Sequence, residues 1–340
     1  MDPLAAVEET AFLLERELAP GFKVKAFRRA AAVLAEWTPE EIAARASDGR
    51  LKATKGVGDR TVEIVTQALE GRVPDYLVGL RERSGFELDA DAAALMEAIR
   101  GDLHSHSDWS DGTTGIPSMA AAARSLGREY LALTDHSPNL TVANGLSAER
   151  LEAELDVVDG LNEGFADGFR LLTGIEVDIL DDGSLDQDPT LLEQLDVVVA
   201  SVHSKLRADS RTMTERMLAA VSNPRTDVLG HCTGRLVQGS RGTRPPSEFD
   251  ARAVFEACAA NGVAVEINSR PERQDPPDEL LALALELGCL FSIDSDAHAP
   301  GHLSLLDRGA ARAAALGVPG DRIVTTWPLP RLLAWTTRPR

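Results

Sequence analysis

The histidines of this chain, together with three acidic residues, follow a series of short apolar runs. Seven histidines occur among 340 residues, and six of them stand just after one of these runs. Imidazole nitrogens and carboxylate oxygens are both ligands of divalent metals. The candidate metal ligands are His104, His106, Asp111, His136, Glu176, His203, His231, Asp296 and His298.

Nine such groups in one place imply bound cations. Without a metal, a cluster of acids and imidazoles would be repulsive or desolvated at a high cost in free energy. The ligand set lacks thiolate, which suits Zn, Mn or Fe, and its size allows two or three ions that share a bridging carboxylate. Cys232, next to His231, is expected to point the other way into the core, and His302 is expected at the surface.

Short apolar runs alternate with helical patterns from residue 100 onward. The helical segments include residues 212–221, with an apparent capping box from Thr212 to Glu215, and residues 247–260 and 278–287. Strands that alternate with helices pair in parallel through right-handed crossovers. We predict an α/β barrel rather than an open sheet, because Rossmann glycines are absent and the spacing is even. The carboxyl ends of its strands then open onto one face, where active sites form. The predicted strands are 101–104, 130–134, 170–179, 195–201, 226–230, 263–268 and 290–294.

The N-terminal region has a different pattern, which predicts a small all-α domain over residues 1–87. Thr38 to Glu41 form a capping box with proline at the first helical position. Gly56 and Gly58 lie between two helical patterns, which indicates a helical hairpin whose second helix starts just after Gly58. We expect residues 88–99 to be a linker and residues 100–340 to form the second domain.

The glycine hairpin is a candidate phosphate site. Backbone N–H groups at the start of a helix can hold a phosphate, and Lys55 and Arg60 flank the glycines. An ordinary glycine turn with solvated charges is an equally good interpretation. Lys55, Gly56, Gly58 and Arg60 are therefore the candidate DNA-binding residues.

The charge of the chain limits its partners. The net charge is −19. Residues 1–90 hold 13 basic and 16 acidic groups, so the remainder carries −16. This argues against broad coating of nucleic acid, which requires Lys and Arg.

The composition also indicates a compartment. No apolar run approaches the roughly 18 residues that cross a bilayer. Asp2, Glu8 and Glu9 do not fit a secretory signal. Three cysteines lack zinc-finger or redox spacing. We expect a cytoplasmic protein without a membrane partner.

Six motifs in order resemble those of the PHP (polymerase and histidinol phosphatase) domain over residues 100–335. The likeness is greatest to the PHP domain at the C-terminus of bacterial family X DNA polymerases. The motifs are Asp102 to Gly112, Leu133 to His136, Gly174 to Glu176, Ser201 to Ser204, Gly230 to Arg235 and Asp294 to His298.

The resemblance implies a distorted (β/α)7 barrel and an assignment for each ligand. One metal would be held by His104, His106, Glu176 and Asp296. Glu176 would bridge to a second metal on His203 and His231, and a third would lie on Asp111, His136 and His298. All nine positions carry the residue types of the family, which implies an active enzyme.

Residues 1–85 resemble the helical N-terminal domain of the same polymerases, through the segment that begins at Phe22 and through Gly56 to Gly58. Relatives with lyase activity place a lysine where this chain has Ile64, so lyase chemistry is not expected. The polymerase palm is missing, because a segment of about a dozen residues cannot hold a domain of on the order of 100. We expect no DNA synthesis.

The expected reaction is metal-assisted hydrolysis of a phosphate ester, with Glu176 and Asp296 as catalytic metal ligands. Arg235 and Lys205 follow ligand-bearing strands and are candidates to bind the free phosphate oxygens, with surface salt bridges as the alternative. Asp135 is expected to orient an imidazole.

One residue and one loop are expected to shape the mouth of the pocket. Arg270, after the sixth strand, would narrow it. Residues 237–247 would form a loop beside it.

The substrate is left between two classes. The first is a DNA 3′ end, cut by a phosphodiesterase or exonuclease, or by a phosphatase, with the helical domain holding the backbone. The alternative is a small phosphomonoester of the histidinol-phosphatase type, which the acidity of the barrel favours. A structural or metal-storing scaffold is a third interpretation, which the complete ligand set disfavours.

Overall fold

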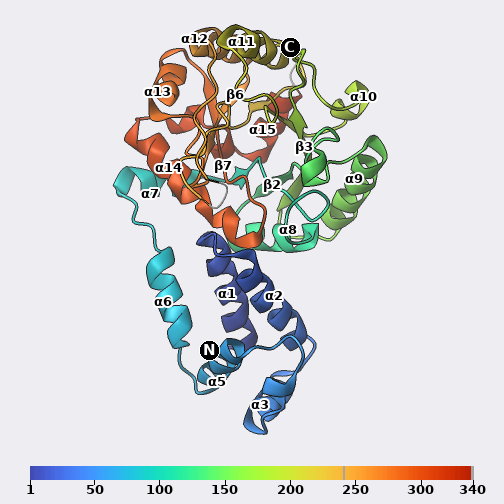
Figure 1. The fold of residues 1–340 in the computed structure, drawn as a ribbon, viewed down its shortest axis with the longest axis vertical. Coiled ribbons are helices and arrows are strands. Elements are labelled where there is room, and N and C mark those ends of the chain that lie inside the picture. Colours follow the sequence, from blue (N-terminus) through green and yellow to red (C-terminus); the bar gives the residue numbers. More distant parts are fainter. Residues whose placement is uncertain (240–241, 338–340) are drawn as a thin grey trace. The chain divides into compact units, whose positions relative to one another are not determined.

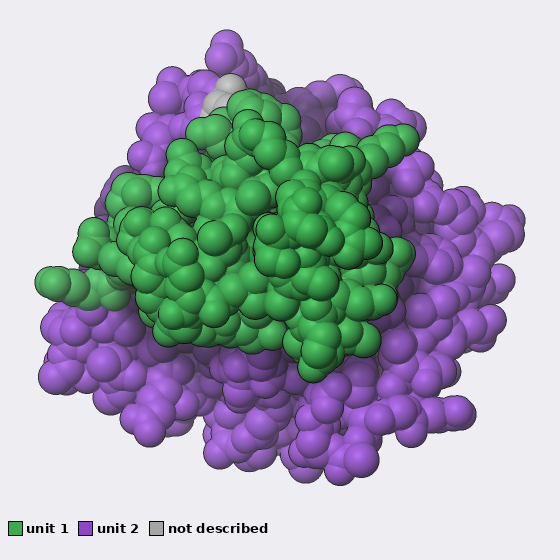
Figure 2. Space-filling model, turned by 90° about the horizontal axis from the view of Figure 1, so that it is seen from below, with its two compact units in different colours: residues 1–87 green, residues 88–340 purple. Residues whose placement is uncertain are grey.

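A computed structural model describes residues 1–239 and 242–337. The chain divides into two compact units, Met1–Glu87 and Leu88–Arg340, which Figure 2 distinguishes by colour. The loop predicted at 237–247 contains positions 240 and 241, which lie outside the described residues.

The first unit is all-helical, as predicted. At α3, the Thr38 side chain accepts from the Glu41 N–H and the Glu41 side chain accepts from the Thr38 N–H, which confirms the capping box. α5 begins directly after Gly58, and Gly56 has a φ of +96° that few other residues adopt. The helices are α1 (Pro3–Arg16), α2 (Gly21–Leu34), α3 (Pro39–Ser47), α4 (Arg50–Ala53), α5 (Asp59–Leu69) and α6 (Asp75–Ser84).

The second unit confirms the predicted barrel of seven parallel strands (Figure 1). The strands pair in chain order from β1 to β7. A parallel bridge between Ser105 and Ala297 then joins the chain after β1 to the chain after β7 and closes the ring. The strands are β1 (Gly101–Asp102), β2 (Tyr130–Leu133), β3 (Arg170–Asp178), β4 (Val197–Ser201), β5 (Val228–Leu229), β6 (Ala264–Asn268) and β7 (Leu290–Asp294).

Helices surround this barrel (Figure 1). The α-helices are α7 (Ala90–Ala98), α8 (Ile116–Ser125), α9 (Ala148–Glu163), α10 (Pro189–Leu192), α11 (Ser210–Val221), α12 (Ala251–Asn261), α13 (Asp278–Glu286), α14 (Leu306–Ala315) and α15 (Leu329–Thr336). The 3₁₀ turns are η1 (Thr141–Ala143), η2 (Pro300–Leu305), η3 (Gly320–Arg322) and η4 (Val324–Thr326).

Three expectations about the helices were wrong. The linker expected at residues 88–99 is instead helix α7, capped by Asp89 and packed on α14, so it belongs to the second unit. Helix α11 starts at Ser210 rather than at residue 212, because the Asp209 side chain caps it by accepting from the Thr212 N–H. Helix α12 starts at Ala251 rather than at residue 247, because Asp250 caps it.

The interior of the barrel changes from apolar to polar along the strands. Side chains on one face of a strand recur every second residue. On β3, Leu172 joins the apolar cluster that also contains Trp327 and Trp335, and Glu176 lies on the same face four residues later. The apolar residues therefore fill one end of the barrel and leave the carboxyl ends of the strands for polar groups. No helix of the described residues is long and apolar enough to cross a membrane.

Candidate metal centre

Glu176 is the hub of the site. It stands near the end of β3 and is 1% exposed. Its Oε1 atom lies 2.9 Å from His231 Nε2 and 3.3 Å from His203 Nε2. Its Oε2 atom lies 2.9 Å from His136 Nδ1, 3.3 Å from His104 Nε2 and 3.6 Å from His106 Nε2. One carboxylate thus faces five imidazoles that come from four different strand ends, because His104 and His106 both follow β1.

The remaining predicted ligands extend the cluster on the side of the His106 ring. Asp296 Oδ1 lies 3.7 Å from His106 Nε2. Asp111 Oδ1 lies 3.2 Å from His298 Nε2 and 3.5 Å from His136 Nε2. The Asp111 side chain is 37% exposed, so the cluster opens to solvent on this side.

All nine predicted ligand positions therefore converge. Four overlapping groups have their ligand atoms within 4.8 Å of one another. These groups are His106, Asp111, His136 and His298; His104, Glu176 and His231; His104, His106 and Asp296; and His136, Glu176 and His203.

The donor set fits divalent cations. His104 Nε2, His106 Nε2, His203 Nε2 and Glu176 Oε1 are buried and have no hydrogen-bond partner within the described ranges. Buried polar atoms are almost always satisfied, so atoms that all point into one cluster indicate missing ligands. Nitrogen and carboxylate donors without thiolate match Zn, Mn or Fe. The cluster is therefore suited to hold divalent metal ions.

Two carboxylates outside the predicted set orient two of the imidazoles. Glu266 Oε1 lies 2.6 Å from His104 Nδ1, and Asp178 Oδ1 lies 3.1 Å from His203 Nδ1. A proton held on Nδ1 in this way leaves the Nε2 lone pair for a metal. The sequence analysis missed both residues, although each stands near the end of a predicted strand.

Asp296 is held by two side chains, one at the end of β6 and one in the segment after it. Arg273 donates from Nε to Asp296 Oδ2 at 2.9 Å, and Asn268 donates to the same oxygen at 3.1 Å. Arg273 is 7% exposed, and its Nη1 and Nη2 atoms donate to no group among the described residues. Arg273 was not among the residues predicted for the site, whereas Arg270, three residues earlier, was expected to narrow the pocket.

Arg270 contacts the same loop after β7, which carries Asp296 and His298. Its Nη1 atom donates to the Asp296 carbonyl at 2.9 Å and lies 3.2 Å from His298 Nδ1. Its other nitrogens bind Glu272. Arg270 therefore supports the strand-end loop that carries Asp296 and His298.

Asp135 does not orient an imidazole, contrary to expectation. Its carboxylate accepts from the Ser107 N–H at 2.8 Å, from Ser107 Oγ at 2.5 Å and from Ser110 Oγ. It also lies against the buried Glu154 of α9. Asp135 therefore fixes the loop between His106 and Asp111, because that loop supplies most of its hydrogen-bond donors.

The ionisation of Glu176 is determined by the positively charged imidazoles around it. Burial disfavours a charge on Glu176, but the imidazoles of His104, His203 and His136 hold its pKa well below the usual range. Burial likewise disfavours protonation of His203, but Glu176 and Asp178 raise its pKa to about 9. Metal binding must therefore displace protons, as it does in any site of this kind.

Arg235 and Lys205 do not point at the cluster. Arg235 donates from Nε to the Arg273 carbonyl at 3.1 Å and from Nη2 to the Gln274 carbonyl, so its guanidinium fixes a loop. Lys205 forms an ion pair with Asp181. The expectation that both bind substrate phosphate finds no support in these contacts.

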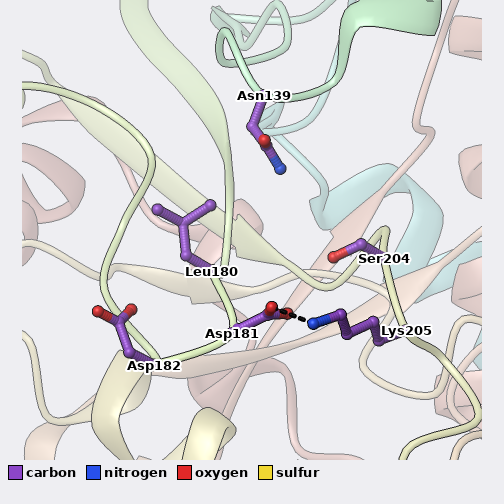
Figure 3. A pocket seen from close by; sticks show the side chains of 6 residues that line it. All are labelled: Asn139, Leu180, Asp181, Asp182, Ser204 and Lys205. Atoms are coloured by element: carbon purple, nitrogen blue, oxygen red, sulfur yellow. Dashed lines mark hydrogen bonds and ion pairs between the residues drawn. The ribbon is translucent and has the colours of Figure 1, made fainter.

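Lys205 instead lines a cavity of about 510 Å³ (Figure 3). The cavity adjoins the His203 side of the cluster, because Ser204 follows His203 and Asn139 donates to Asp178 at 2.8 Å. The lining residues are Asn139, Leu180, Asp181, Asp182, Ser204 and Lys205.

Cys232 and His302 were not predicted to bind metal, and they lie in different environments. Cys232 is buried in the core, as expected. His302 is only partly exposed, and its Nδ1 atom accepts from the His298 N–H at 3.1 Å. His302 therefore lies only partly at the surface, because η2 turns its Nδ1 atom toward the His298 N–H.

The candidate DNA-binding residues lie at the hairpin of the first unit. Lys55 forms no ion pair or hydrogen bond among the described side chains, whereas Arg60 pairs with Glu63 at 2.6 Å and lies over the Tyr76 ring. Gly56 is packed against Arg29 of α2. These contacts give the hairpin an accessible lysine beside the exposed start of α5.

Comparison with known proteins identifies relatives of this chain. Residues 102–270 match the family model of the PHP domain. The DNA polymerase/3′-5′ exonuclease PolX of Bacillus subtilis (strain 168) is 41% identical over 228 residues, which are 66% of this chain and 39% of that protein. The probable phosphatase YcdX of Escherichia coli (strain K12) is 27% identical over 238 residues, which are 67% of this chain and 90% of YcdX.

A solved structure is also similar. Histidinol phosphate phosphatase from Lactococcus lactis, in complex with Zn, L-histidinol and phosphate, aligns with a TM-score of 0.46 and 19% identity, over 64% of this chain and 92% of that one. The match over residues 102–270 identifies a PHP domain within the second unit of this chain.

Proposed function

We propose that this chain is a hydrolase that cleaves phosphate esters with divalent metal ions. The observation that carries the proposal is the Glu176 carboxylate, buried and within 3.6 Å of a nitrogen of each of five histidines. Relatives of the chain are named as an exonuclease and as probable phosphatases, and these names support the same reaction class.

The site would hold two or three ions of Zn, Mn or Fe. The distances support the assignment made from the sequence, in which Glu176 joins the first group to the second. The first group is His104, His106, Glu176 and Asp296; the second is Glu176, His203 and His231; the third is Asp111, His136 and His298. Bound cations would neutralise phosphoryl oxygens, lower the pKa of a water and stabilise the leaving oxygen.

Arg273 is the side chain best placed to hold the phosphate. Its Nε atom is anchored on Asp296, while Nη1 and Nη2 remain available as donors. A guanidinium can bind two oxygens of one phosphoryl group at once. Arg273 takes the role that the sequence analysis gave to Arg235 and Lys205.

A DNA 3′ end is the first candidate substrate. The 41% identity to PolX supports it, although that match spans only 39% of PolX. The hairpin residues Lys55, Gly56, Gly58 and Arg60 would hold the DNA backbone, since the N–H groups at the start of α5 can bind a phosphate. DNA synthesis and lyase chemistry are not part of the proposal.

A small phosphomonoester is the second candidate. YcdX is matched over 90% of its length, which supports a phosphatase. The net charge of −16 beyond residue 90 also disfavours long nucleic acid.

A substrate panel separates the two candidates. Purified chain loaded with Mn or Zn would be given single-stranded DNA and small phosphomonoesters. Shortening of DNA by single nucleotides supports the first candidate, and phosphate release with intact DNA supports the second. No hydrolysis of any phosphoester by metal-loaded protein would contradict the proposed function.

A further inference from the structure

Arg216 is a buried arginine without a carboxylate partner. It lies on α11 and is 3% exposed. Its guanidinium forms no ion pair among the described residues and is satisfied by backbone carbonyls and one hydroxyl. Asp178 and Asp181 lie near enough to favour its charge but form no ion pair with it. Burial of a guanidinium without a direct ion pair is costly, so a side chain needed only for packing would be apolar here.

The hydrogen bonds of Arg216 join two loops at the carboxyl ends of β3 and β4. Nε donates to the Ile179 carbonyl at 2.9 Å and to the Leu180 carbonyl at 2.8 Å. Nη1 donates to the Ser204 carbonyl at 2.9 Å, and Nη2 donates to Ser204 Oγ at 3.1 Å and also to the Ile179 carbonyl. Within the described ranges, no other donor reaches the carbonyls of Ile179 and Ser204.

These two loops carry a metal ligand and the carboxylate that orients it. Ile179 follows Asp178, and Ser204 follows His203. Asp178 Oδ1 accepts from the His203 N–H and lies beside His203 Nδ1, each at 3.1 Å, which turns Nε2 toward Glu176. Arg216 therefore ties together the residues that directly follow both members of this pair.

The loop after β3 packs tightly against α11. Gly183, in the loop after β3, has a φ of +83°, and a Cβ there would lie 2.4 Å from Ala219 Cβ and 2.7 Å from the Arg216 carbonyl. The loop is thus pressed against the helix that carries Arg216.

We propose that Arg216 is a positioning residue that sets His203 for metal binding and shapes the adjoining cavity. The inference rests on the proposed metal site. Leu180 and Ser204, which both accept from Arg216, also line the cavity beside Lys205 (Figure 3). The guanidinium acts through backbone carbonyls of the two loops and does not contact the metal or the substrate.

The test compares Arg216→Lys with Arg225→Lys in the full chain. Arg225 is a matched control, because it also donates to two carbonyls, those of Leu192 and Leu195 at 2.9 and 3.0 Å, at the opposite end of β4 from His203. Zinc stoichiometry and affinity would be measured by competition with a chromophoric chelator, and stability would be measured by unfolding in EDTA.

We expect Arg216→Lys to weaken one class of zinc site by about tenfold or more while the others keep their affinity. Arg225→Lys should bind zinc like the parent protein, even where both variants lose similar stability in EDTA. Arg216→Gln provides a second variant should the lysine variant not fold.

Equal zinc binding by the Arg216 variants and the parent, or equal losses in the Arg216 and Arg225 variants, would overturn the inference. A parent protein that binds none of Zn, Mn and Fe would instead overturn the proposed function, so the two failures are distinguishable.

Discussion

Replacing Glu266 by glutamine tests how the metal ligands are oriented. Glu266 is fully buried on β6. Its Oε1 atom lies 2.6 Å from His104 Nδ1, and its Oε2 atom accepts from the His231 N–H and, at 3.3 Å, from Asn268. A carboxylate can accept on both sides, but the amide of glutamine has one acceptor and one donor side.

The size of the effect follows from these contacts. In Glu266→Gln, the amide NH₂ must face either the His104 Nδ1–H or the His231 N–H, so one buried donor loses its acceptor. A buried donor left without an acceptor lowers the stability of the folded protein by about 1–3 kcal/mol. Loss of such an outer partner of a ligating histidine lowers metal affinity by about 10- to 100-fold.

The assay is a zinc competition titration on folded protein. Asp227→Asn is the control, because Asp227 is also a buried carboxylate that accepts a backbone N–H, from Val198 at 3.0 Å, but precedes β5 at the other end of the barrel. Zinc affinity within about twofold of the parent in Glu266→Gln, or an equal loss in the control, would refute the reasoning.

Three further perturbations test other parts of the account. Glu176→Ala should abolish phosphoester hydrolysis and reduce the number of bound ions, as measured by turnover of a phosphoester and by metal analysis; full activity would end the bridging assignment. Glu154→Gln should stabilise the protein increasingly as the pH rises. Burial, with the adjacent Asp135, raises the pKa of Glu154 well above 4.5, so the folded state keeps a proton that the unfolded chain releases. The difference in the free energy of unfolding should therefore grow above about pH 4.5 by up to about 1.4 kcal/mol per pH unit, and denaturant titrations at pH 5 and 8 that give equal differences would contradict this. Joint replacement of Lys55 and Arg60 by alanine should weaken DNA binding and lower its logarithmic salt slope by about two, and an unchanged slope would show that the hairpin is structural.

The barrel and the nine converging side chains could be predicted because both follow from local patterns. Apart from β1, the strands lie in short apolar runs, and every ligand except Asp111 stands within four residues of a strand end. Parallel strands in a closed ring bring these ends to one face whatever the details of packing. Glu176 therefore needed only its position on β3 to be placed beside His104 and His231.

The supporting residues could not be predicted in the same way. Arg273 lies in an irregular segment after β6, and nothing local indicates that its guanidinium turns toward Asp296 while Arg235 turns away. Such directions are determined by loops that meet only in the folded chain. Asp135 shows the same limit, since its partners Ser107 and Ser110 belong to a different strand-end loop.

Helix starts depend on competition between nearby caps. Thr212 has the spacing of a capping box, but Asp209 lies three residues earlier and accepts the Thr212 N–H itself. Aspartate and asparagine are stronger N-caps than threonine, so the earlier start prevails. Asp89 provides a similar signal for α7, at the start of the segment that was expected to be a linker.

The most direct test of the central claim is a count of metal ions in purified chain after exposure to Zn, Mn and Fe and removal of excess ions. The nine converging side chains predict at least two ions per chain, and fewer in Glu176→Ala. Less than one ion per chain with every metal, or an unchanged count in the variant, would contradict the account.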